Sequence, residues 1–125
     1  MKLFTVEEAN ALLPSVREIV RKIQRTYARV SSAQEQARLA AGGAAQGGGG
    51  MEGGGDYVLS LSDLAAASGE LEELGVQLKD YERGLIDFPT LREGRVVLLC
   101  WQLGEGDELE WWHDLEAGFA GRQPL

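Results

Sequence analysis

The sequence predicts an α+β fold, in which a long N-terminal antiparallel helical hairpin is followed by a small antiparallel β-meander, all within one domain of residues 1–125. Apolar residues recur every three or four positions over residues 5–41 and, more loosely, over 57–75, which is the helical period. After residue 75 the apolar segments become short and rich in β-branched or aromatic residues. Glycine or proline separates them, as is typical of strands joined by turns.

The first helix is expected over residues 5–41. Thr5 and Glu8 form a capping-box pattern, in which each side chain accepts a hydrogen bond from the other residue's backbone amide. Pro14 falls inside the apolar stripe without changing its phase. Because proline lacks an amide proton and crowds the preceding turn, we expect a kink there rather than an end.

Residues 42–55 contain nine glycines and predict a flexible linker. The second helix is expected over residues 57–75, packed antiparallel against the first. The sheet is expected over residues 76–116, with a C-terminal tail over 117–125.

The net charge of −8 excludes some classes of partner. Residues 1–50 hold seven basic and four acidic groups, whereas residues 51–125 hold five basic and sixteen acidic ones. This balance disfavours nucleic acid and anionic membranes, which need a basic surface. No apolar run approaches the roughly 20 residues of a membrane span, and the N-terminus lacks a secretion signal, so we expect a cytoplasmic protein.

The chain has one cysteine, Cys100, and one histidine, His113. One cysteine cannot form an intramolecular disulfide, and this pair falls short of a zinc cage or an iron–sulfur site. The sequence therefore predicts no metal and no cofactor.

Three segments of the sequence resemble a known family: "FTVEEANALLP", "KDYERGLIDFPTLREGRVVLLCWQLGE" and "WWHDLEAGFAGRQPL". Together they are similar to a prokaryotic family of small proteins described only as domain of unknown function 2203. The resemblance implies a cytoplasmic prokaryotic protein with the same plan of helical hairpin and sheet. It implies no activity, substrate or catalytic residue.

A Cys–His dyad requires Cys100 and His113 to face each other across a hairpin, which depends on the register. A two-residue turn at Gly106 and Asp107 would place them directly opposite. A five-residue loop over residues 104–108 would instead pair Leu99 with His113. The second register separates apolar from polar side chains more cleanly, so it is preferred, with Cys100 and His113 on opposite faces and no catalytic residue.

Most acidic residues of the second half are interpreted as a solvated surface. Asp87 differs, because it lies between Ile86 and Phe88 in an apolar strand. Arg122 is expected to be its ion-pair partner if the tail folds back over the sheet.

The leading hypothesis for function is a non-enzymatic module for protein interaction or self-association, most simply a homodimer. An acidic partner protein is expected at the basic row, whose members are Arg17, Arg21, Arg25 and Arg29. The alternative is a small enzyme, or a ligand- or metal-binding protein, with a polar pocket on the sheet. Its candidate residues are Asp87, Trp101, Glu105, Trp112, His113 and Arg122.

Overall fold

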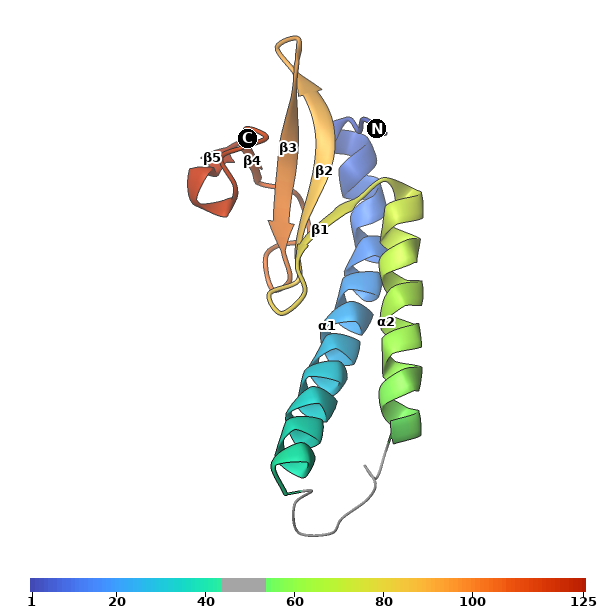
Figure 1. Ribbon diagram of the computed structural model, residues 1–125. Helices are drawn as coiled ribbons and strands as arrows, with labels where there is room; N and C mark the ends of the chain where they lie inside the picture. The colour runs from blue at the N-terminus through green and yellow to red at the C-terminus, as the bar shows by residue number, and fades with distance from the viewer. Residues whose placement is uncertain (44–53) are drawn as a thin grey trace.

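The structure, a computed structural model, describes residues 1–43 and 54–125 (Figure 1). Two long helices lie side by side, and a sheet lies against the N-terminal half of the first. In chain order the elements are α1 (Val6–Gly43), α2 (Gly54–Leu74), β1 (Gln77–Asp80), β2 (Leu85–Arg92), β3 (Arg95–Gln102), β4 (Trp111–His113), the 3₁₀ helix η2 (Phe119–Gly121) and β5 (Gln123–Pro124). The predicted α+β fold is confirmed. None of the described helices has the length and apolar character needed to cross a membrane.

The capping box at the start of α1 forms as expected. The Glu8 amide donates to Thr5 Oγ1 at 3.0 Å, and the Thr5 amide donates to Glu8 Oε1 at 2.9 Å. These bonds satisfy backbone donors that a helix start leaves free, and they lower the pKa of the Glu8 carboxyl. The helix continues through Pro14 to Gly43, so the proline does not end it.

Both ends of the predicted linker are helical, because α1 extends to Gly43 and α2 begins at Gly54. The rest of that linker, residues 44–53, lies outside the described residues. α2 ends in a Schellman motif, in which the Val76 amide donates to the Leu71 carbonyl and the Gly75 amide to the Glu72 carbonyl, both at 3.0 Å. Gly75 has φ +86°, a conformation that only glycine adopts without steric cost.

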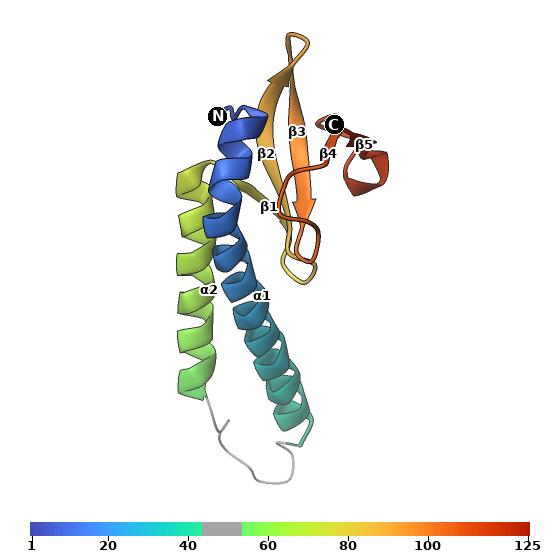
Figure 2. The ribbon, with the colours of Figure 1, turned by 180° about the vertical axis from the view of Figure 1, so that it is seen from behind.

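The sheet is antiparallel, with its five strands side by side in sequence order (Figure 2). Glu93 and Gly94 form a two-residue turn between β2 and β3, with φ values of 50° and 79°. Positive φ at both positions is the signature of the hairpin turn that matches strand twist. The turn fixes the ladder, which starts at Arg92 with Arg95 and therefore pairs Asp87 with Cys100.

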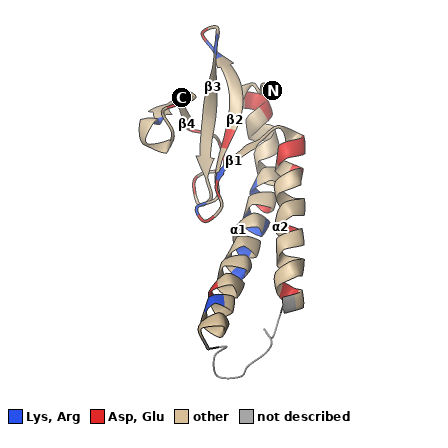
Figure 3. Ribbon diagram, in the orientation of Figure 1, with Lys and Arg blue, Asp and Glu red and all other residues tan. Residues whose placement is uncertain are grey.

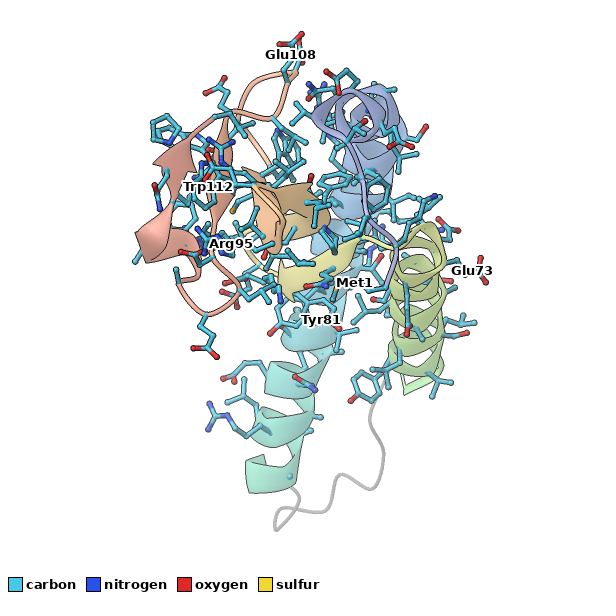
Figure 4. The ribbon with its side chains drawn as sticks, turned by 90° about the horizontal axis from the view of Figure 1, so that it is seen from above. Met1, Glu73, Tyr81, Arg95, Glu108 and Trp112 are labelled. Atoms are coloured by element: carbon cyan, nitrogen blue, oxygen red, sulfur yellow. The ribbon has the colours of Figure 1, made fainter. Side chains whose placement is uncertain are left out.

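α1 and one face of the sheet form the main core. Figure 4 shows the helices on one side of β2 and β3 and the C-terminal segment on the other. The sheet contributes the buried residues Ile86, Phe88, Val97, Leu99, Trp101 and Trp112. The helical side is built around Leu13, Val16, Val20 and Ile23 of α1 and Leu71 of α2. Alternate residues of β2, β3 and β4 therefore face away from α1.

The pairing of β3 with β4 differs from both registers considered for this hairpin. His113 pairs with Leu98, and Trp112 pairs with Leu99. The preferred register is wrong by one residue, and such a shift moves every side chain of β4 to the other face. The expectation that Cys100 and His113 lie on opposite faces is therefore wrong.

Tertiary contacts of the loop between β3 and β4 explain the difference. The Leu109 amide donates to Asn10 Oδ1 at 2.7 Å, and Trp101 Nε1 donates to the Gly106 carbonyl at 2.9 Å. Leu109, which follows directly after the loop in the preferred register, lies outside the strands and packs in the core between helix and sheet. The loop thus spans residues 103–110, longer than either turn inferred from the sequence.

The C-terminal segment belongs to the sheet rather than forming a separate tail. β5 pairs with β4, with Gln123 opposite Trp112, and the Leu125 amide donates to the Glu110 carbonyl at 2.9 Å. This segment lies on the side of β2 and β3 away from the helices (Figures 1 and 4).

Candidate metal centre

Asp87, Cys100 and His113 meet inside the sheet, one from each of β2, β3 and β4. Asp87 lies directly opposite Cys100, and His113 lies opposite Leu98, two residues along the same face. A carboxylate oxygen, the thiol sulfur and a ring nitrogen of these residues all lie within 4.8 Å of one another. None of the three residues is more than 2% exposed.

Both ring nitrogens of His113 have partners. Nδ1 lies 2.7 Å from the backbone carbonyl of Asp114, and Nε2 lies 3.1 Å from Asp87 Oδ1. Because a carbonyl oxygen only accepts, Nδ1 carries a proton. Nε2 is therefore the nitrogen whose lone pair can serve as a ligand, held in this orientation by the backbone.

The thiol of Cys100 is not activated as a nucleophile. Burial, followed by the negative charge of Asp87, raises the pKa of Cys100 from 9.0 to about 12, so the thiol is protonated at neutral pH unless a cation binds. A catalytic cysteine needs the opposite shift and a histidine nitrogen to take its proton. Both nitrogens of His113 already have other partners.

A second charge pair, Glu105 and Arg122, lies close enough to Cys100 to act on its pKa. Arg122 Nη2 donates to both carboxylate oxygens of Glu105 at 2.8 Å. The Arg122 guanidinium also lies over Trp111, 5.0 Å from the ring centroid. The Arg122 side chain is only 10% exposed, and its Nε has no hydrogen-bond acceptor in the described part of the chain.

Four of the six candidate residues lie around this centre, namely Asp87, Glu105, His113 and Arg122. Trp101 and Trp112 lie on the other face of the sheet, in the core against α1. The tail does fold back, but the ion pair between Asp87 and Arg122 expected in that case is wrong. Arg122 binds Glu105, and Asp87 binds His113.

Sequence reasoning missed Cys100 as a member of the site. The Glu93–Gly94 turn was the signal that could have found it, because counting back from a two-residue turn places Asp87 opposite Cys100. The preferred register, which pairs Leu99 with His113, would also place Trp111, two residues before His113, on the core face with Leu99. Trp111 lies instead on the face that carries Cys100 and His113.

The three side chains are a suitable ligand set for a divalent transition metal. Carboxylate, imidazole and thiolate all bind zinc, at about 2.0 to 2.3 Å, which separates neighbouring ligand atoms by roughly 3.2 to 3.8 Å. Movements of about an ångström would bring the three atoms to that geometry. Three protein ligands leave a fourth position for water or another small ligand.

Comparison with known proteins identifies a family but no activity. A family model described as "Uncharacterized conserved protein (DUF2203)" matches residues 2–125. No curated protein and no solved structure matches the chain. Since the family model covers nearly the whole sequence, the chain belongs to the family of uncharacterized conserved proteins DUF2203.

Proposed function

We propose that this protein binds a divalent transition-metal ion, with Zn²⁺ as the best match, through Asp87, Cys100 and His113. The observation that carries the proposal is the convergence of the three ligand atoms within 4.8 Å inside a buried part of the sheet. A thiolate favours zinc over magnesium or calcium, which prefer oxygen ligands. This is the metal-binding form of the alternative hypothesis drawn from the sequence.

Charge balance supports the proposal. A thiolate and a carboxylate carry two negative charges, which one divalent cation neutralises. In the metal-free protein the Cys100 thiol keeps its proton, because burial and the charge of Asp87 raise its pKa to about 12. Metal binding therefore displaces the thiol proton, so the affinity for metal should increase with pH.

Because the three ligands come from three adjacent strands, bound metal would stabilise the sheet. Bound metal would connect β2, β3 and β4, so loading stabilises the folded state by its binding free energy. Because the ligands are almost fully buried, we expect slow exchange and retention of metal through purification. A reducing cytoplasm, the compartment that the sequence predicts, would keep Cys100 available as a ligand.

The test is the metal content of the purified protein. Native protein produced in zinc-supplemented cells should contain about one metal equivalent per chain by elemental analysis. The variants Cys100→Ser, Asp87→Asn and His113→Gln should each retain less than about a tenth of that amount. Asp114→Asn is the matched control, because Asp114 hydrogen-bonds His113 through its backbone carbonyl while its side chain pairs with Arg95.

Circular dichroism of each variant establishes that loss of metal does not reflect loss of the fold. Native protein that contains no divalent transition metal and takes up none from Zn²⁺, Co²⁺ or Ni²⁺ solutions contradicts the proposal.

A further inference from the structure

The C-terminal half of α1 and the N-terminal half of α2 extend beyond the sheet (Figures 1 and 2). An open groove of about 660 Å³ lies between the two helices there. Its lining comes from Ala28, Arg29, Ser32, Ala33 and Gln36 of α1 and from Asp56, Tyr57, Leu59, Ser60 and Asp63 of α2. We call this surface the groove face.

The groove face and its surroundings leave apolar surface uncovered. Leu59, which lines the groove, is 63% exposed, and Val58, Leu61 and Leu39 nearby are also exposed. Apolar residues lie around much of the circumference of α2. A helix that packs on only one side has its apolar residues in a single stripe. Of these exposed residues only Leu59 lines the groove, and the others broaden the apolar surface of the two helices around it. Exposed leucine in a groove is typical of a binding surface.

The charges on the two sides of the groove are opposite (Figure 3). On α1, Arg21, Arg25 and Arg29 follow one another at four-residue intervals on the stripe that lines the groove. On α2, Asp56 and Asp63 line the groove one heptad apart, and α2 contains no lysine or arginine.

Part of this charge is unpaired within the chain. Arg17 pairs with Asp107, and Arg21 pairs with Glu18. Arg25 and Arg29 form no ion pair with any residue of 1–43 or 54–125, and neither of the two aspartates that line the groove does so.

We propose that the groove face binds a second copy of this chain. One surface carries a basic row on α1 and, on α2, an acidic row with the exposed Leu59 beside it. Two such surfaces related by a two-fold axis are complementary in charge, because the acidic row of each copy lies against the basic row of the other. The four helices would then form a bundle that covers Leu59 in both copies. An acidic protein of another kind would match only the basic row and would leave α2 exposed.

The mass in solution tests this inference. Light scattering coupled to gel filtration should give twice the chain mass of 13.6 kDa across the micromolar range. Leu59→Glu should reduce it to that of one chain. Leu91→Glu is the matched control, because Leu91 is equally exposed (59% against 63%) but lies at the end of β2, away from the groove.

A second set of variants tests the charge pairing without changing the apolar surface. Replacing Arg25 and Arg29 by glutamate should raise the dissociation constant of the dimer at least about tenfold. Adding Asp56→Arg and Asp63→Arg to that variant should restore association.

Three results would overturn the inference: a monomeric native protein at every concentration, a dimer that survives Leu59→Glu, or a dimer that Leu91→Glu disrupts. A monomer captured by an unrelated acidic protein would assign the face to that partner instead.

Discussion

Asp87 Oδ1 and His113 Nε2 lie 3.1 Å apart, although they come from strands that do not pair with each other. Their contact spans β3, and Cys100 is the β3 residue on that face opposite Asp87. Their side chains are only 2% and 3% exposed. Burial of two ionisable groups costs more free energy than an apolar filling of the same space, so packing alone does not account for them. This cost is consistent with a binding role for the cluster.

Removal of one member of the buried pair should be strongly destabilising. Asp87→Ala leaves His113 without its partner, so we expect the metal-free protein to lose about 3 kcal/mol of unfolding free energy. Urea denaturation, monitored by tryptophan fluorescence, measures this loss of unfolding free energy. Glu18→Ala removes an exposed ion pair to Arg21 and should change stability by less than about 0.5 kcal/mol. Equal effects of the two substitutions would contradict the buried contact.

The thiol of Cys100 should react slowly in the folded protein. It is 1% exposed, and its pKa is raised to about 12, so both access and thiolate content are low. Iodoacetamide at pH 8 should label folded protein at least about a hundredfold more slowly than protein unfolded in urea. Mass spectrometry measures the extent of labelling over time. Comparable rates in folded and unfolded protein would argue against the buried site and in favour of a reactive dyad.

The raised pKa of Cys100 also makes stability depend on alkaline pH. Below the unfolded pKa of about 9 the thiol is protonated in both states, and its contribution to stability is complete. Between that value and about 12 only the unfolded chain loses the proton, so stability falls as pH rises. The free energy of unfolding of metal-free native protein should decrease more steeply between pH 9 and about 11 than that of Cys100→Ala. Parallel curves would show that the environment of Cys100 differs from the one described.

Two glycines, one inside α2 and one directly after its end, should respond in opposite directions to alanine. Gly69 lies inside α2, and an added Cβ would meet nothing within 4 Å, so Gly69→Ala should stabilise by about 0.5 to 1 kcal/mol. Gly75 has φ +86°, and its Cβ would lie 2.9 Å from Lys2 Cβ. Gly75→Ala should therefore destabilise by about 1 to 2 kcal/mol. Thermal unfolding of both variants checks this, and a shift of the same sign in both would refute the Schellman geometry.

Local patterns in the sequence predicted the helices and the sheet. The capping box at Thr5 and the apolar period of α1 are short-range signals that tertiary structure leaves intact. The register of the β2–β3 ladder could also be predicted from the sequence, because a two-residue turn at Glu93 and Gly94 sets it.

The centre itself depended on contacts that no local pattern contains. Asn10, almost a hundred residues away in sequence, binds the Leu109 amide and fixes the long loop before β4. That loop decides which face His113 occupies, and periodicity alone chose the wrong one. The pairing of Arg122 with Glu105 likewise depends on how β5 returns beside β4.

Titration of the metal-free protein with Co²⁺ tests metal binding by the Asp87, Cys100 and His113 centre most directly, because cobalt replaces zinc and reports its own ligands by absorption. We expect a thiolate-to-cobalt charge-transfer band that saturates at about one Co²⁺ per chain, is displaced by Zn²⁺ and is absent from Cys100→Ser. Native protein that shows no such band, or a band that persists in Cys100→Ser, would contradict the proposed centre.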